Sequence, residues 1–316
     1  MISFIQRDDS PEIPPPYKFP GVTIMSFRLQ ADIGKLQGLC DDLLNIGSFE
    51  DRGFEYLAFT DFVDMEILTY PKMLFDEEPY SSRGYATQQE LYFRFYVWKL
   101  NSFGGLLFPD LLPELFFPFI YVDNSWSMIS GRNVIGFPKV MAQFYPTPVL
   151  GANPLKLKVS ALALDTYSPT TELTWHPIVE INPTTSLAAA PQPLHGNWPW
   201  TGLTAGAADP ILEEMLEKFL STLRYEFQTV QLKQFRDLPT GACFQAVVNT
   251  PFTPYNVGVL KPLPAVSITV HEYDSLKIPT SLGLQANTPL QPLLQYSISL
   301  DMRMDNGSNL FVNADF

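Results

Sequence analysis

One lysine in the middle of the chain stands in a sequence context that could support covalent chemistry. Lys139 follows a proline and closes residues 131–139, GRNVIGFPK, after a long apolar run. A lysine in a largely apolar setting is expensive to keep charged, so its free amine becomes available as a nucleophile toward carbonyl groups. The stretch therefore makes Lys139 a candidate nucleophile toward carbonyl compounds. The plain alternative is a surface or interface lysine, because lysines are rarely buried.

The bulk composition predicts a globular fold that is mainly β with some α. Of the 316 residues, 46% are hydrophobic, which is enough for a substantial core. The chain carries 24 Phe, 14 Tyr and 29 Pro, a composition that favours short strands joined by many turns over long helices. No shift in composition divides the sequence, so residues 1–316 are expected to form a single domain.

Net charge and cysteine content limit the classes of partner and the cellular compartment that we expect. A formal charge of −13 argues against nucleic acid and anionic membrane surfaces as partners, because both carry phosphate groups. Residues 1–18 hold acidic side chains and three consecutive prolines where a secretory signal needs an apolar stretch. Cys40 and Cys243 form no disulfide framework. We therefore expect a cytoplasmic protein. Residues 106–122 are apolar but contain prolines and acidic residues, which predicts a buried, turn-broken segment instead of a membrane span.

Metal and cofactor chemistry leave no signature in the sequence. His176, His195 and His271 stand alone, without a second ligand at helical or hairpin spacing. The sequence contains neither a glycine-rich phosphate loop nor a Gly-x-Ser-x-Gly nucleophile elbow. We expect no metal and no cofactor, so the chemistry falls to the side chains themselves.

Hydrophobic periodicity predicts the elements that must position the lysine. Alternating or β-branched runs predict strands over residues 22–29, 91–100, 155–159 and 294–303. Apolar spacing predicts helices over 33–44, with Asp32 as N-cap, and over 209–223, with Asp209 as N-cap. Residues 1–21 are expected to form an extended proline-rich arm, and residues 75–89 and 187–208 to form loops, the second of them long.

The strand over residues 91–100 has two distinct faces. Because side chains alternate along a strand, Leu91, Phe93, Phe95 and Val97 share one apolar face. The other face carries the polar and aromatic side chains of Tyr92, Arg94, Tyr96 and Trp98. One face is therefore expected to enter the core while the other remains available to a site.

Two segments of the chain resemble the active site of the acetoacetate decarboxylase family. Residues 119–124, FIYVDN, and 131–139, GRNVIGFPK, are similar to the family pattern of aromatic-x-Asp-Asn, then Gly-Arg-Glu, then Gly-Phe/Tyr-Pro-Lys. Weaker similarity extends over residues 16–19, 83–85 and 230–237. The resemblance implies an antiparallel β-cone or barrel with peripheral helices, a homo-oligomer, and a Schiff base on Lys139.

The sequence departs from that pattern at several positions that the resemblance places in the site. Val140 stands where proven decarboxylases carry a second lysine, and Asn133 replaces the glutamate of Gly-Arg-Glu. Tyr96 falls where those enzymes have a strand glutamate, and Arg28 matches the family's strand arginine after a one-residue slip. A second family glutamate has no counterpart in residues 104–117. The resemblance therefore implies a more apolar pocket, with Tyr96 as a proton donor.

These features predict a carbon–carbon lyase that uses Lys139 on a β-keto acid or related keto compound, with decarboxylation of a substrate bulkier than acetoacetate. Arg28, Tyr96, Arg132, Asn133 and Val140 are the candidate substrate-binding residues. The alternatives are an aldol or dehydration step through the same enamine, and an isomerisation or cyclisation without an imine in which a side chain polarises the carbonyl. A final alternative is a non-catalytic binding protein in which Lys139 pairs with a carboxylate and stays charged.

Overall fold

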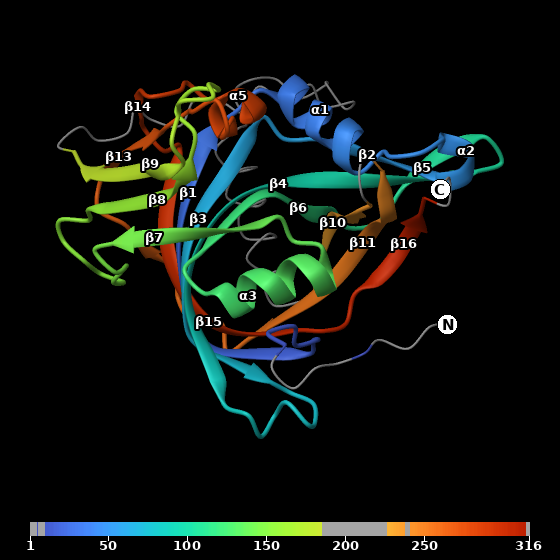
Figure 1. The fold of residues 1–316 in the computed structure, drawn as a ribbon, viewed down its shortest axis with the longest axis horizontal. Helices are drawn as coiled ribbons and strands as arrows, with labels where there is room; N and C mark the ends of the chain where they lie inside the picture. Colours follow the sequence, from blue (N-terminus) through green and yellow to red (C-terminus); the bar gives the residue numbers. More distant parts are fainter. Residues whose placement is uncertain (1–4, 6–9, 185–225, 238–240, 314–316) are drawn as a thin grey trace.

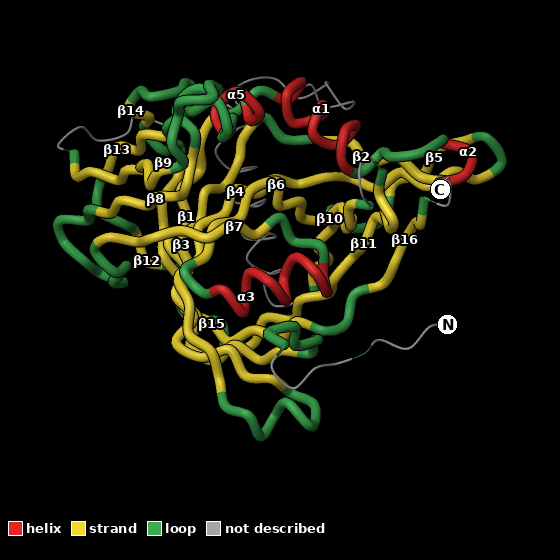
Figure 2. Tube along the Cα trace, in the orientation of Figure 1, coloured by secondary structure: helices red, strands yellow, loops and turns green. Residues whose placement is uncertain are grey.

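The computed structural model describes residues 5, 10–184, 226–237 and 241–313 (Figure 1). The long loop expected over residues 187–208 and the helix expected over 209–223 lie outside the described residues. Strands dominate the part of the chain that is described (Figure 2), which confirms the prediction of a mainly β protein.

Seven strands form a closed circuit through their pairings. Each pairs with the next in this order, and β4 also pairs with β6: β6 (Glu114–Val122), β10 (Phe227–Arg236), β11 (Ala242–Tyr255), β15 (Leu294–Met304), β1 (Tyr17–Gln30), β3 (Phe62–Phe75) and β4 (Tyr85–Phe103). Most of these pairs are antiparallel, but β6 and β10 run parallel. The sheet is therefore mixed.

A second group of strands branches from this circuit at β6, so the predicted cone is not a clean barrel. The branch follows the order β7 (Lys139–Tyr145), β8 (Leu157–Ala163), β9 (Thr174–Pro183), β13 (Val266–Val270) and β14 (Pro289–Leu290). The remaining short strands are β2 (Phe54–Ala58), β5 (Leu106–Pro109), β12 (Lys261–Pro262) and β16 (Ser308–Val312). Because β7 pairs with β6 in parallel, the branch begins at Lys139.

Few helices accompany the described strands. They are α1 (Ile33–Leu43), α2 (Phe49–Arg52), α3 (Ser125–Ser130), the π-helical turn η1 (Gly131–Ile135) and α5 (Ile278–Leu282). Asp32 caps α1 as predicted, because its side chain accepts a hydrogen bond from the Lys35 backbone N–H at 2.9 Å. No described helix is long and apolar enough to cross a membrane.

Buried apolar side chains gather in two clusters on opposite faces of the strands. Leu91, Phe93, Phe95 and Val97 all enter the larger cluster, as their alternation predicts. Tyr92, on the other face of β4, belongs to the second cluster. The second cluster also contains Ile120 of β6, the residue that pairs with Lys139.

Three predicted boundaries are wrong. β1 begins at Tyr17, inside the expected arm, because its pairing with β15 is interrupted between Phe19 and Val22 and this bulge accommodates Pro20. β4 begins at Tyr85, so the loop before it ends at Gly84. Residues 106–122 are buried only in part, since β5 is an exposed strand that pairs with the end of β4.

Candidate active site

The segment that ends at Lys139 is a short helical unit between β6 and β7. The Asn124 side chain begins α3 by accepting hydrogen bonds from the backbone N–H groups of Trp126 and Ser127, at 3.0 and 3.1 Å. The unit ends at Gly136, whose φ of 97° suits glycine. A Cβ on Gly136 would also lie 2.7 Å from the Cβ of Lys233. The glycine therefore lets the chain turn back into β7 close to β10.

Lys139 is buried, with 9% of its surface exposed. Its Nζ donates hydrogen bonds to Glu90 Oε2 and to Ser127 Oγ, both at 2.9 Å. Its alkyl chain runs directly over Gly131, where a Cβ would come within 2.6 Å of the Lys139 Cδ. The first residue of the GRNVIGFPK stretch therefore leaves the space that its last residue occupies.

Glu90 is the ion-pair partner of Lys139 and was not among the predicted site residues. The buried Glu90 carboxylate accepts three hydrogen bonds. Its Oε2 accepts from Lys139 Nζ at 2.9 Å and from Gln88 Nε2 at 3.1 Å, and its Oε1 accepts from the Tyr70 hydroxyl at 3.3 Å. The alternation predicted from residue 91 holds further back along β4. Extending it toward the N-terminus places Gln88 and Glu90 on the face of Tyr92, so the signal was present in the strand pattern.

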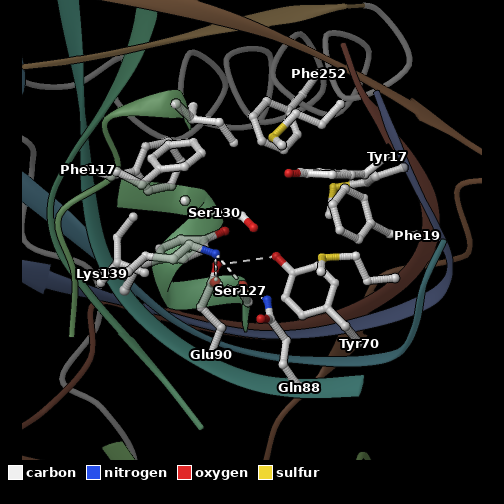
Figure 3. Close-up of a pocket in the computed structure, with 18 of the residues that line it drawn as sticks. Tyr17, Phe19, Tyr70, Gln88, Glu90, Phe117, Ser127, Ser130, Lys139 and Phe252 are labelled. Atoms are coloured by element: carbon white, nitrogen blue, oxygen red, sulfur yellow. Dashed lines mark hydrogen bonds and ion pairs between the residues drawn. The ribbon is translucent and has the colours of Figure 1, made fainter. Parts of the chain in front are cut away.

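A cavity of about 60 Å³ opens beside the Lys139 amine (Figure 3). Its wall is mostly aromatic and aliphatic, with three methionines from β3 and β15. Glu90, Gln88 and Tyr70 face Lys139 from one side, while Phe117 and Phe252 lie on the other (Figure 3). Lys139 and Glu90 are the only charged side chains among the lining residues of the described chain.

Arg28 and Tyr96 do not line this cavity, which corrects their predicted role. Arg28 forms a two-pronged ion pair with Asp64, at 2.8 and 3.0 Å, and its guanidinium lies 3.8 Å from the centre of the Phe62 ring. Tyr96 accepts a hydrogen bond from Arg94 at 3.0 Å, and burial raises its pKa to about 12. Tyr96 and Glu90 share a face of β4 but are about 20 Å apart along the strand, since each residue advances by ~3.3 Å.

Arg28 and Tyr96 instead belong to a buried ionic network on the same face. Arg94 donates to Glu66 Oε1 at 2.7 Å and lies 3.5 Å from Asp64. The two arginines hold the pKa of Asp64 below its usual value, against the effect of burial. The Tyr92 hydroxyl donates to Glu66, and its ring lines the cavity. The network therefore supports the cavity wall without reaching the lysine amine.

The remaining predicted site residues surround Lys139 without facing the cavity. The exposed Arg132 side chain donates to the Lys139 backbone carbonyl at 3.0 Å. Asn133 donates to Glu12. Val140 packs against the larger apolar cluster, on the opposite face of β7 from the lysine side chain. Val140 therefore does not line the cavity, because adjacent residues of a strand point to opposite faces.

The described part of the N-terminal arm fastens the helical unit in place. Ser130 Oγ accepts a hydrogen bond from the Ile13 backbone N–H at 3.0 Å and donates to the Pro11 carbonyl at 2.8 Å. The Tyr17 hydroxyl, whose ring lines the cavity, donates to the Ile13 carbonyl. Ile13 is buried in the second apolar cluster. The arm thus packs against the element that carries Lys139.

Comparison with known proteins identifies the fold. No family model matches the chain, and no curated protein matches its sequence. Acetoacetate decarboxylase from Legionella pneumophila superposes with a TM-score of 0.56 and 14% identity, over 96% of this chain and 91% of that chain. A second acetoacetate decarboxylase structure gives 0.55 and 13% identity, over 97% and 94%. The enduracididine biosynthesis enzyme MppR, complexed with pyruvate, gives 0.50 and 14% identity, over 96% and 93%. The chain therefore has the acetoacetate decarboxylase fold that its GRNVIGFPK stretch predicts.

Proposed function

We propose that this protein is a carbon–carbon lyase that forms a Schiff base between Lys139 and a small keto compound. The observation that carries the proposal is the Lys139 Nζ, buried beside an apolar cavity and 2.9 Å from both Glu90 Oε2 and Ser127 Oγ. A buried amine with an acceptor for its proton can act as a nucleophile. The fold supports the proposal, because solved neighbours include a decarboxylase and an enzyme that holds pyruvate, a keto acid.

Imine formation follows from the pairing of Lys139 with Glu90. Transfer of a proton from Nζ to the Glu90 carboxylate gives a neutral amine, which attacks the carbonyl carbon of the substrate. By way of Glu90, two protons of the nitrogen pass to the carbonyl oxygen, which leaves as water. The product is a protonated imine beside the regenerated Glu90 carboxylate, so the cavity wall returns to zero net charge.

Decarboxylation is the first reaction that this imine would support. The electron pair of the bond to the departing CO₂ moves into the imine and gives an enamine, which is then protonated and hydrolysed to release the product and free Lys139. A substrate carboxylate adds a negative charge that only Lys139 can balance among the lining residues, and it must share Lys139 with Glu90. Loss of neutral CO₂ replaces the substrate carboxylate and the protonated imine by an uncharged enamine, and the buried site returns to zero net charge when the enamine takes up a proton.

The cavity limits the size of the substrate. About 60 Å³ suits a short keto compound, whereas the sequence predicts a substrate bulkier than acetoacetate. Met73, Met302 and Met304 line the wall, and methionine side chains adapt readily because they are unbranched and have three rotatable bonds. We therefore assign accommodation of a larger substrate to rotation of these methionines.

Borohydride trapping tests the proposal. Acetoacetate, pyruvate and an aryl β-keto acid are each incubated with the protein, reduced with borohydride, and examined by peptide mass spectrometry. The expected result is a reduced adduct on Lys139 with at least one of them, and the adduct mass shows whether CO₂ has left. Lys139→Arg is the matched control, because it keeps a cation beside Glu90 but forms no stable imine.

Two outcomes would contradict the proposal in different ways. A folded protein without an adduct from any of the three compounds, or from an uncharged ketone, would support the binding protein in which Lys139 stays paired with Glu90. Turnover of a substrate that persists in Lys139→Ala would support an isomerisation or cyclisation without an imine.

The charge of the cavity wall also favours a second candidate, an aldol-type or dehydration step through the same enamine. An uncharged carbonyl substrate needs no counter-charge. Among the described residues that line the cavity, the only charged side chains are those of Lys139 and Glu90. The Tyr70 hydroxyl stays protonated at neutral pH, because burial raises its pKa well above the ordinary value. Tyr70 therefore takes the role of proton donor that was predicted for Tyr96. Adduct formation with an uncharged ketone but none with a keto acid would select this candidate.

Homo-oligomerisation and a cytoplasmic location stay predictions. Size-exclusion chromatography with light scattering measures the first.

A further inference from the structure

One buried acceptor beside Lys139 has no hydrogen-bond partner in the described part of the chain. The Gln88 side chain is 4% exposed and lines the cavity. Its Nε2 donates to Glu90 Oε2 at 3.1 Å, but its Oε1 has no hydrogen-bond partner among the described residues. Leaving a buried carbonyl oxygen unpaired is costly, so such atoms in native proteins are nearly always satisfied by a partner or a ligand.

The neighbouring carboxylate determines which amide atom is left without a partner. A reversed Gln88 amide would place its oxygen against Glu90 Oε2, and two acceptors cannot bond to each other. Nε2 must therefore contact Glu90, and Oε1 is the atom that remains. The tyrosine hydroxyls of the wall are directed elsewhere: Tyr70 donates to Glu90, Tyr17 to the Ile13 carbonyl, and Tyr92 to Glu66.

This acceptor lies close to the reacting amine. Lys139 Nζ and Gln88 Nε2 both reach the same oxygen, Glu90 Oε2, at 2.9 and 3.1 Å, so the two nitrogens are at most about 6 Å apart. Figure 3 shows Gln88 and Lys139 on either side of Glu90. A group that pairs with Gln88 Oε1 must therefore be near the carbonyl in the substrate.

We propose that Gln88 Oε1 accepts a hydrogen bond from the substrate, and that the substrate class is a keto compound with a neutral donor, a hydroxyl or an N–H, close to its carbonyl group. The proposal rests on the proposed function, because it takes the carbonyl carbon to be bound at Lys139. A neutral donor fits better than an ammonium group, because the wall already balances one cation with one anion. A carboxylate oxygen at this point would face another acceptor.

A matched pair of ketones tests the assignment. Hydroxyacetone and butanone have nearly the same size, but only hydroxyacetone carries a donor. We expect borohydride trapping on Lys139 to favour hydroxyacetone by about 10- to 100-fold, the range that follows from one unpaired buried acceptor. In Gln88→Leu the ratio of hydroxyacetone to butanone trapping should fall to about 1, whatever the absolute rate of either ketone, because both react at the same amine and differ only in the donor.

Calorimetric titration of the same two ketones, without borohydride, separates this assignment from the proposed function. Tighter binding of hydroxyacetone to the wild type, with the preference lost in Gln88→Leu, supports the assignment even if neither ketone is trapped, in which case the Schiff base is refuted. Equal binding of the two ketones to the wild type, or a preference that survives in Gln88→Leu, overturns the role of Gln88.

Discussion

The sharpest test of the site is Gly131→Ala, because one added methyl group meets the Lys139 side chain and the backbone at Gly131 is not strained. The Gly131 backbone is already right-handed helical, at φ −60° and ψ −44°, so alanine costs no backbone energy there. Its Cβ would lie 2.6 Å from the Lys139 Cδ and 2.9 Å from its Cε. Carbon atoms pack at about 3.5–4.0 Å, so the lysine side chain must move by about 1 Å.

A shift of that size breaks the geometry of the amine. Nζ cannot keep both of its 2.9 Å hydrogen bonds, to Glu90 and Ser127, after the alkyl chain has moved. Misplacement by about 1 Å can cost ~100-fold in rate, so we expect adduct formation on Lys139 to slow by about that factor. Intact-mass analysis of timed borohydride quenches measures this rate, and thermal unfolding confirms that the variant is folded.

Gly38→Ala is the matched control. A Cβ at Gly38, inside α1, meets nothing within 4 Å, so the variant should be more stable by about 0.5–1 kcal/mol and should react at the wild-type rate. The reasoning would be refuted if folded Gly131→Ala formed the adduct as fast as Gly38→Ala.

Three further predictions concern stability. Burial raises the pKa of Glu114 from 4.5 to about 7, so the fold favours its protonated form and stability should fall as pH rises from about 4.5 to 7. In urea unfolding, Glu114→Gln should match the wild type at pH ~4 and exceed it by about 3 kcal/mol at pH ~8, and a pH-independent difference would contradict this. Arg94→Met leaves Glu66 buried without its cation and should lower the free energy of unfolding by about 3–5 kcal/mol; a loss below ~1 kcal/mol would refute the role of the network. Val140→Lys places an ammonium group against the core and should destabilise by about 1–3 kcal/mol without faster adduct formation; a faster reaction would show that the new lysine reaches the cavity.

The motif identified Lys139, and the alternation of β4 holds a signal for more of the site than was predicted from it. Period-two alternation placed Leu91, Phe93 and the apolar face of β4 in the core, and the structure agrees. The same alternation, continued three residues toward the N-terminus, reaches Gln88 and Glu90, the two side chains that contact or approach Lys139. Their place in the strand is not evident from the sequence, because polar residues at the start of a strand resemble the end of a loop.

Arg28 and Tyr96, which were assigned to the site by resemblance to the family pattern, lie outside the cavity. Arg28 and Tyr96 lie on strands of the same circuit, but a strand advances ~3.3 Å per residue, so a shift of a few residues moves a side chain out of the cavity. They form buried ion pairs and hydrogen bonds with Asp64 and Arg94 instead. Sequence position identifies the strand, but pairing register decides which level of the strand meets the lysine.

By itself, the sequence determined the local features: the mainly β character, the alternation of β4, the Asp32 cap, and a Lys139 delivered after a proline into an apolar context. Each of these depends on neighbours within a few residues, and such short-range preferences can be read from the chain. Only the tertiary structure decided that Glu90 and Gln88 face that lysine, and that Val140 and Tyr96 do not. Lys139 and Glu90 are 49 residues apart, and their contact follows from strand pairing across the circuit, where long-range hydrogen bonding and burial set the register.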